Sequence, residues 1–361
     1  MQFAQTTRPP TNLAKPNHPF YHLNSAILTF YPAAEERTYT SMFCLSTILF
    51  TIYNNVDTNS GPPEHAQIIL LWTWPFGDKF PLNDCPPFFN IKGCFYTAKR
   101  TLFPSADAVV IHHMDVSHFK NQLPQMPRPP NQYWVWFNLE SPSLSPNLNF
   151  MDNLINLTMS YRADSDIFSP YGWLEENKEE ENFTIPPKTK LVAWAVSNWN
   201  PQSRRVRYYE QLKNFLSIDI YGSQHKPLPR NRQQQTLSRY KFYLSFENSA
   251  HEDYITEKLW KNAFANGIVP VVMGPSRENY ERFIPKDSFI HVDDFSTAQE
   301  VATYILKLDS DDKAYQQYIH WRSRPHPFAG INWQTAYCRV CKAIKEAPKH
   351  KTILSLGDWY K

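Results

Sequence analysis

From residue 66 onward, short apolar runs alternate with segments of helical periodicity, and this alternation constrains the fold more than any other feature of the sequence. The runs are continuous rather than alternately polar and apolar, which is typical of strands covered on both faces. They lie at residues 67–73, 108–112, 133–137, 190–196, 218–221, 241–246, 268–273 and 288–292, and helical patterns include 254–266 and 298–306. Strands that alternate with helices favour parallel sheets, so we expect an α/β protein with two doubly wound sheets.

A polar connector separates two halves of the predicted fold. Residues 174–187 contain five glutamates and end in two prolines, as in a solvated linker. We therefore expect one domain at 66–185 and a second at 186–361, preceded by an N-terminal arm at 1–65. Within the arm, the 12 residues 42–53 are apolar. Since a membrane-spanning helix needs about 20 such residues, a short signal anchor and a buried segment are equally good interpretations.

The composition excludes several classes of function. A formal net charge of +3 is too small to indicate nucleic acid as the main partner. The nine glycines include neither the dinucleotide-binding spacing G-x-G-x-x-G nor a P-loop. A nucleotide would therefore have to be held by side chains and by the N-termini of helices.

Four of the five cysteines form two close pairs at opposite ends of the predicted domains, Cys85 with Cys94 and Cys338 with Cys341. Four cysteines allow three disulfide pairings, and a zinc site is the competing interpretation. Zinc ribbons usually combine two C-x-x-C knuckles, and only Cys338–Cys341 has that spacing, which favours disulfides. Cys44 has no evident role.

A polar cluster follows the run 241–246. Ser249 and Glu252 have the spacing of a capping box, which predicts a helix that begins nearby. Gly267 follows Asn266 at the end of the helical pattern, and glycine there is typical of a helix C-terminus. The sequence therefore predicts a helix from this cluster to Gly267.

In such a helix, Tyr254, Glu257 and Lys258 share one face of the first turns. A lysine there opposes the helix dipole, and a bound anion such as a diphosphate would explain it. Glu257 could accept hydrogen bonds from ribose hydroxyls. Arg205, which follows the run 190–196, is a second candidate ligand for phosphate oxygens. The alternative for each residue is a charged, solvated face.

Polar residues also follow the strands predicted in the first half. Glu140 lies where a general base would stand in an α/β enzyme, although a surface role is commoner for such a residue. His112 and His113 follow the preceding strand and are candidates for substrate binding or for satisfied rim positions. Asp164 and Asp166 imitate the D-x-D of manganese-dependent sugar transferases, but their position in the first half argues against that role.

Four segments of the second half are highly specific, and they make the sequence similar to the animal α1,3-fucosyltransferases of the Lewis-antigen type, in glycosyltransferase family 10. The similarity extends over roughly residues 66–361. The segments are 240–249, 253–260, 269–280 and 289–294. Weaker matches in the rest of the chain are 74–77, 138–142, 161–162, 171–172 and 196–200.

The resemblance implies a GT-B fold, in which two Rossmann-like domains face a cleft. It implies inverting transfer of L-fucose from GDP-β-L-fucose to the 3-hydroxyl of GlcNAc in N-acetyllactosamine-type glycans, giving products of the Lewis x type. The first domain would bind the acceptor glycans of glycoproteins and glycolipids, and the second the donor. The setting would be the lumen of the Golgi, with a type II signal anchor in the membrane. No metal cofactor is expected, although manganese could stimulate.

The resemblance also assigns roles to particular residues. The implied general base is Glu140. The implied donor-site residues are Ser197, Asn198, Arg205, Asn248, Tyr254, Glu257 and Lys258, and the acceptor-site residues are His112, His113, Met114, Asp115 and Tyr161. The implied disulfides are Cys85–Cys338 and Cys94–Cys341, and the sequons at Asn156 and Asn182 agree with a lumenal setting.

One departure from the family concerns linkage. Met114 stands where relatives usually have Arg or Trp, at a position associated with the choice between α1,3 and α1,4 transfer. We expect α1,3 transfer and keep dual α1,3/1,4 transfer as an alternative. Two further alternatives are a manganese-dependent D-x-D transferase and a glycan-binding protein without turnover.

Overall fold

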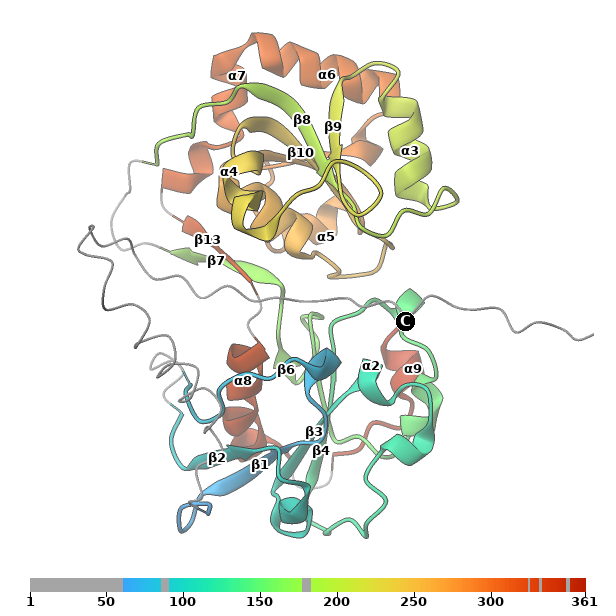
Figure 1. Ribbon diagram of the computed structural model, residues 1–361, viewed down its shortest axis with the longest axis vertical. Coiled ribbons are helices and arrows are strands. Elements are labelled where there is room, and N and C mark those ends of the chain that lie inside the picture. The colour runs from blue at the N-terminus through green and yellow to red at the C-terminus, as the bar shows by residue number, and fades with distance from the viewer. Residues whose placement is uncertain (1–60, 86–90, 177–182, 324, 331–332, 349–350) are drawn as a thin grey trace, which may run out of the picture. The chain divides into compact units, whose positions relative to one another are not determined.

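The computed structural model describes residues 61–85, 91–176, 183–323, 325–330, 333–348 and 351–361 (Figure 1). Most of the predicted arm, with the apolar run 42–53 and Cys44, lies outside these residues, as does Asn182. None of the described helices is both long enough and apolar enough to cross a membrane. Two separate parallel sheets confirm the predicted α/β class.

The first sheet has six parallel strands in the order β2-β1-β3-β4-β5-β6. Its strands are β1 (Gln67–Leu71), β2 (Cys94–Thr97), β3 (Ala108–His112), β4 (Tyr133–Asn138), β5 (Leu157–Ser160) and β6 (Ile167–Phe168). The predicted runs at 67–73, 108–112 and 133–137 correspond to β1, β3 and β4. Every residue of β3 is buried, as its uninterrupted apolar sequence indicates.

A helix from the end of the chain completes the core of this first sheet. In α8 (Trp333–Glu346), apolar residues recur three and four positions apart and form one stripe. The stripe consists of Trp333, Ala336, Tyr337, Val340, Cys341 and Ile344, all buried in the same cluster as β1, β3 and β4. The short α9 (Leu356–Trp359) also packs here through Leu356. The C-terminal segment therefore belongs structurally to the first sheet.

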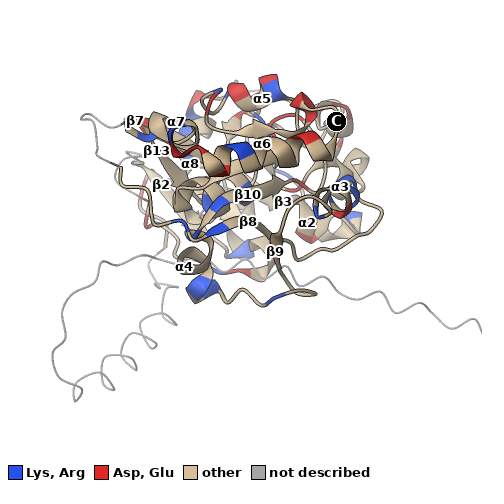
Figure 2. Cartoon of the chain, turned by 90° about the horizontal axis from the view of Figure 1, so that it is seen from above, with Lys and Arg blue, Asp and Glu red and all other residues tan. Residues whose placement is uncertain are grey.

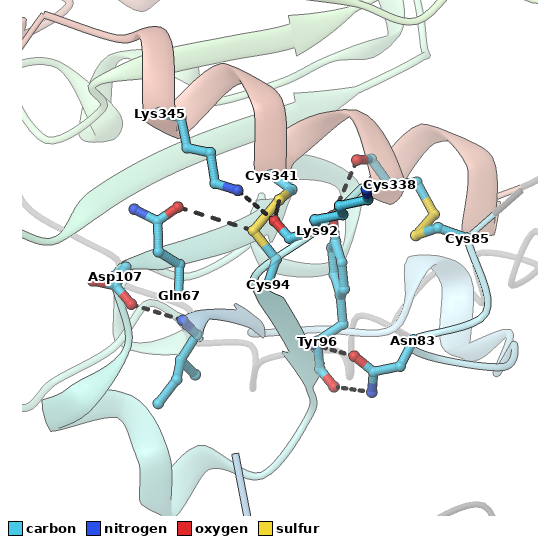
Figure 3. Close-up of a disulfide and its surroundings, with 11 residues drawn as sticks. Gln67, Asn83, Cys85, Lys92, Cys94, Tyr96, Asp107, Cys338, Cys341 and Lys345 are labelled. Carbon is cyan, nitrogen blue, oxygen red and sulfur yellow. Dashed lines mark hydrogen bonds between the residues drawn. A yellow bond between two sulfur atoms is a disulfide. The ribbon is translucent and has the colours of Figure 1, made fainter. Parts of the chain in front are cut away.

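Two disulfides fix α8 to the segment around β2, as Figure 3 shows. Cys85 is bonded to Cys338 and Cys94 to Cys341, the pairing that the resemblance implied. The Tyr96 hydroxyl also donates a hydrogen bond to the Cys338 carbonyl over 3.0 Å. The thiols are thus consumed in disulfides, and in the described part of the chain no group of His, Cys, Asp and Glu residues could hold a metal ion.

The second sheet has five parallel strands in the order β12-β11-β10-β8-β9. They are β8 (Lys190–Ala195), β9 (Ile218–Tyr221), β10 (Tyr240–Phe246), β11 (Val269–Met273) and β12 (Ile290–His291). All five predicted runs of the second half are confirmed as strands, although β12 is shorter than its run. The two sheets are the parallel α/β units that a GT-B fold requires.

Helices cover both faces of the second sheet. On one face, α3 (Arg204–Leu212) and α6 (Ala298–Ser310) bury Val206 and Ile305 against Leu244 of β10. On the other face, α4 (Gln233–Leu237) and the turns at 258–266 pack against Tyr243 and Val272. Basic and acidic residues are mixed on the outer helices, where α5 (Arg277–Glu281) and α6 carry both signs (Figure 2).

The chain crosses between the sheets through a small antiparallel pair. β7 (Gly172–Glu176) pairs with β13 (Pro325–Ala329), and the Trp173 and Phe328 rings stack with centroids 4.2 Å apart. The prediction of a solvated connector from residue 174 is therefore wrong for residues 174–176. These residues find a strand partner in β13, far away in the sequence, which no local signal shows.

Candidate active site

The segment after β10 differs from its prediction. No helix begins near Ser249, because a π-helical segment starts only at Lys258 and continues to Ala263, followed by a 3-10 turn. The Ser249 hydroxyl donates to Ser141 over 2.7 Å, and Glu252 pairs with Arg282 over 2.8 Å. These long-range partners replace the predicted capping box. The predicted end is confirmed, since Gly267 adopts a left-handed conformation with φ of 60°.

Lys258 therefore lies in a first helical turn, as predicted, whereas Tyr254 precedes the helix. The Lys258 ammonium lies 3.1 Å from Glu247 and 3.1 Å from Glu257, and it donates to the Thr256 hydroxyl over 2.8 Å. Burial alone would lower the pKa of Lys258, but the two carboxylates outweigh it and raise that pKa above its ordinary value. Lys258 is thus a largely buried, permanently charged cation.

Arg205 supplies a second buried cation. It lies in the first turn of α3, where Ser203 accepts a hydrogen bond from the Val206 backbone as the N-cap. Its side chain donates to the Asn198 carbonyl over 2.6 Å, and its Nε has no hydrogen-bond partner among the residues that the structure describes. The positive charge of Arg205 also lowers the pKa of Lys258. The two cations therefore lie close enough to repel each other, and an anion bound between them would relieve that repulsion.

The other predicted donor-site residues border these cations. Ser197 and Asn198 form an exposed turn after β8, and the Ser197 carbonyl accepts from Ser223 over 2.8 Å. Tyr254 is only 2% exposed, and its hydroxyl is hydrogen-bonded to the Asn248 side chain. Burial raises the pKa of Tyr254 well above its ordinary value, with Glu140 as the next contributor. The structure therefore brings this tyrosine, Asn248 and the predicted base together.

Glu140 follows β4 at the carboxyl edge of the first sheet. Its backbone N–H donates to the Asn138 side chain over 3.2 Å, and its carbonyl accepts a hydrogen bond from the Tyr360 hydroxyl. Burial raises the pKa of its carboxyl group, while the charge of Lys258 opposes that rise. Within the described residues, nothing donates a hydrogen bond to the carboxylate itself. It is therefore free to accept a proton from a substrate, and the charge of Lys258 beside the other sheet acts on its pKa.

Tyrosines from distant parts of the chain enclose Glu140. The Tyr161 ring lies 5.0 Å from that of Tyr254 and 6.0 Å from that of Tyr360. The Tyr171 hydroxyl donates to the Leu139 carbonyl over 2.6 Å. Sequence reasoning missed the contributions of Tyr171 and Tyr360. The motif at residues 171–172 was the only available signal for Tyr171, and Tyr360 lies 220 residues from Glu140 with no local signal.

The loop that follows Glu140 contacts the loop that follows β10. Ser143 Oγ and His251 Nε2 are 2.6 Å apart, and the contact between Ser141 and Ser249 lies beside it. Further along, the Ala163 backbone donates to the buried Asp253 carboxylate over 2.8 Å. These contacts set the predicted base directly against the segment that carries the predicted donor-site residues.

Three of the predicted acceptor-site residues are buried in this structure, and their contact with an acceptor stays a prediction. His112 and His113 are 0% exposed and Tyr161 is 1% exposed. His112 Nδ1 is 2.8 Å from Asp115, and His113 Nε2 is 2.9 Å from the Pro146 carbonyl. Burial lowers the pKa of His113 to about 4, as expected of a neutral core histidine. Met114 and Asp115 are only partly buried and are the more accessible of the predicted acceptor-site residues.

The D-x-D carboxylates have protein partners. Asp164 accepts two hydrogen bonds of 2.8 Å from the Arg162 guanidinium, and Asp166 accepts from the Thr158 backbone over 2.8 Å and from its hydroxyl over 3.1 Å. These hydrogen bonds stabilise the turn between β5 and β6. The nearby Asn156 side chain donates to the Lys351 carbonyl over 2.8 Å, and its glycosylation stays a prediction.

Comparison with known proteins identifies the family. The profile described as fucosyltransferase, N-terminal, matches residues 64–172, and that of glycosyltransferase family 10 (fucosyltransferase), C-term, matches residues 185–359. Human 4-galactosyl-N-acetylglucosaminide 3-alpha-L-fucosyltransferase FUT5 is 48% identical over 309 residues, which cover 84% of this chain and 82% of that protein. Human 3-galactosyl-N-acetylglucosaminide 4-alpha-L-fucosyltransferase FUT3 is 48% identical over 304 residues, which cover 83% and 84%.

A solved structure has a related fold. The crystal structure of an α1,3-fucosyltransferase with GDP-fucose aligns with a TM-score of 0.50 and 18% identity, covering 82% of this chain and 94% of that one. At this identity the likeness concerns the fold alone, and it agrees with the GT-B arrangement. The sequence matches extend over both sheets and all the predicted site residues, and the chain belongs to the fucosyltransferases of glycosyltransferase family 10.

Proposed function

We propose that this protein transfers L-fucose from GDP-β-L-fucose to the 3-hydroxyl of GlcNAc in N-acetyllactosamine-type glycans, with inversion at the fucose carbon. The observation that carries the proposal is that the loop after Glu140 contacts the loop after β10, where Ser249 donates to Ser141 over 2.7 Å and Ser143 lies 2.6 Å from His251. In the described residues no group donates a hydrogen bond to the Glu140 carboxylate, and the charge of Lys258 lowers the pKa of Glu140. The charge of Arg205 acts in turn on Lys258. The names of the family relatives support fucose as the sugar that is transferred.

In the proposed reaction, Glu140 removes the proton from the acceptor hydroxyl while that oxygen attacks the anomeric carbon of fucose. The bond between this carbon and the phosphate oxygen breaks on the opposite face, and GDP leaves with the additional negative charge. Lys258 and Arg205 stabilise that charge, since both are desolvated and already in place. Glu257 is half exposed, and its carboxylate could turn from Lys258 to the ribose hydroxyls.

A single carboxylate is enough for inversion, whereas a retaining double displacement needs a second, nucleophilic one. Glu247 does not fit that second role, because it is buried and accepts hydrogen bonds from Thr256. We also propose that no metal cofactor is required, since two protein cations take its place at the leaving group. Manganese could still stimulate the reaction. The pairing of Asp164 with Arg162 weighs against the manganese-dependent D-x-D alternative.

Overall identity does not decide the linkage, because relatives named as 3-fucosyltransferases and as a 4-fucosyltransferase are equally similar to the chain. We propose α1,3 transfer of the Lewis x type, with dual α1,3/1,4 transfer as the alternative that Met114 leaves open. The proposed acceptors are glycans of glycoproteins and glycolipids. The proposed location is the lumen of the Golgi membrane system, which the two disulfides support because they persist in oxidising compartments.

Incubation with GDP-fucose and a panel of type 1, type 2 and sialylated acceptors tests the proposal, with the product linkage determined by NMR. We expect fucose on the 3-hydroxyl of type 2 chains. Glu140→Gln should reduce turnover by about 10²- to 10⁴-fold, the usual contribution of a general base, without weakening GDP binding. Glu210→Gln, on the surface of α3, is the control. Glycan binding without turnover in the wild type would favour the non-enzyme alternative, and normal turnover of Glu140→Gln would remove the assignment of the base.

A further inference from the structure

Glu247 is a buried acid that the proposed chemistry does not use. It is the first residue after β10, and its side chain is only 1% exposed. It accepts hydrogen bonds from the Thr256 backbone over 2.9 Å and from the Thr256 hydroxyl over 2.9 and 3.0 Å. Its remaining contact is the ion pair of 3.1 Å with Lys258. Within the described part of the chain, the hydrogen bonds and the ion pair of this carboxylate thus all lead to the segment that presents Lys258.

The fold makes room for this carboxylate at one specific position. Gly274 follows β11 next to it, and a Cβ atom there would lie 3.1 Å from Glu247 Cγ and 2.7 Å from the Tyr280 hydroxyl. Burial raises the pKa of Glu247, and the charge of Lys258 opposes the rise. A buried charge is unfavourable unless it is paired, and an apolar side chain of similar volume would often be as stable. The stability of the sheet therefore does not explain why an acid is here.

The second carboxylate beside Lys258 behaves differently. Glu257 contacts the same ammonium over 3.1 Å, but its side chain is 49% exposed. A half-exposed side chain can turn away when a ligand arrives, whereas Glu247 is fixed by its two donors on Thr256. Of the two acids, only Glu247 can therefore define where the ammonium lies both with and without a ligand.

We propose that Glu247 is a positioning residue for the transfer reaction: it holds the Lys258 ammonium where the diphosphate of the donor binds. The inference rests on the proposed role of Lys258. The inference and a simple net-charge argument predict opposite effects of removing the Glu247 carboxylate on GDP binding. If only net charge mattered, removing the Glu247 carboxylate would strengthen the binding of an anion. If positioning matters, its removal weakens that binding.

The test is GDP binding to Glu247→Gln, measured by calorimetry on the whole protein, together with the KM values for GDP-fucose and for the acceptor. The substitution keeps the volume and removes the charge. We expect about tenfold weaker GDP binding and a higher KM for GDP-fucose, in the range of a hydrogen bond to a charged group. The KM for the acceptor should not change. Glu247→Asp, which keeps the charge, should recover part of the loss, and it replaces the Gln variant if that variant is unstable.

A double-mutant cycle separates positioning from a general structural role. In a Lys258→Met background, Glu247→Gln should have no further effect on GDP binding, because the group that it positions is absent. Glu252→Gln, on the same loop but paired with Arg282, is the matched control and should bind GDP like the wild type. Unchanged or tighter GDP binding by Glu247→Gln, or an equal loss in both backgrounds, would overturn the inference. Wild-type GDP binding by Lys258→Met would instead overturn the proposed role of Lys258 itself.

Discussion

The two disulfides between α8 and the segment around β2 should contribute to stability in a strongly non-additive way. The paired cysteines are 253 and 247 residues apart, so either bond alone closes a loop of about 250 residues. In the chain-entropy model such a loop is worth about 5.5 kcal/mol. Once one bond exists, however, the second closes only the short ring made by residues 85–94 and 338–341. This ring of 14 residues is worth about 3 kcal/mol.

Removal of either disulfide should therefore lower the free energy of unfolding by about 3 kcal/mol, and removal of both by about 8.5 kcal/mol. The double loss exceeds the sum of the single losses because the surviving bond keeps the long loop closed. For a chain of this size, the melting temperature should fall by about 5 °C in each single variant and by about 15 °C in the double variant.

The variants are Cys85→Ala with Cys338→Ala, Cys94→Ala with Cys341→Ala, and all four changes together. Cys44 is replaced by Ser in every protein, including the reference, so that no free thiol can exchange with a disulfide. Calorimetry and urea unfolding without reductant give the two quantities. Strictly additive losses, or a single variant as unstable as the quadruple one, would refute the reasoning, and the reference protein in dithiothreitol should match the quadruple variant.

Three further predictions concern the site. Lys258→Ala should weaken GDP binding by about 10- to 100-fold, as expected for loss of a charged partner, and unchanged binding in calorimetry would contradict its role. Because burial raises the pKa of Glu140 and a base must be ionised, activity should fall on acidification at a higher pH than an ordinary glutamate gives. Lys258→Ala should move this acidic limb to still higher pH, because the lysine lowers that pKa, and a shift to lower pH would count against the contact. EDTA should leave transfer unchanged, and its complete loss would favour a metal-dependent mechanism.

The sheets could be predicted because parallel strands buried on both faces leave uninterrupted apolar runs in the sequence. All five runs of the second half are strands for this reason. β2, β5 and β6 were not predicted, because β2 (CFYT) and β5 (LTMS) contain polar residues and β6 (IF) is too short, so none of them gives such a run. These three strands form because they pair with other strands of the sheet.

The helix after β10 shows where local rules fail. Ser249 and Glu252 have the spacing of a capping box, but Ser141 and Arg282 hold their side chains instead. Tertiary partners of this kind can override a local preference worth about 1 kcal/mol. The end of the segment was predictable because Gly267 needs no partner to adopt its left-handed conformation.

The candidate site could be predicted only in part. Parallel strands end at one edge of a sheet, so Glu140 could be placed at the edge of the first sheet, and Lys258 and Arg205 beyond the strands of the second. The tyrosines around Glu140 could not be predicted, because Tyr360 lies 220 residues away in the sequence and contacts Glu140 only in the folded chain. Glu247 directly follows β10, but its role depends on the path of the chain back to Thr256, which no local pattern shows.

The electrostatic interaction between Glu140 and Lys258 should link donor binding to the strength of the proposed base. Without a donor, the Lys258 charge holds the pKa of Glu140 below the value that burial alone would give. A diphosphate bound at Lys258 and Arg205 would cancel that charge, so the pKa of Glu140 should rise further and the carboxylate should become the stronger base. The carboxylate that removes the acceptor proton would then be most basic only when the diphosphate leaving group is bound. The acidic limb of kcat, measured with saturating donor, should consequently lie at higher pH than the acidic limb of kcat/KM for GDP-fucose, and coincident limbs would exclude this coupling.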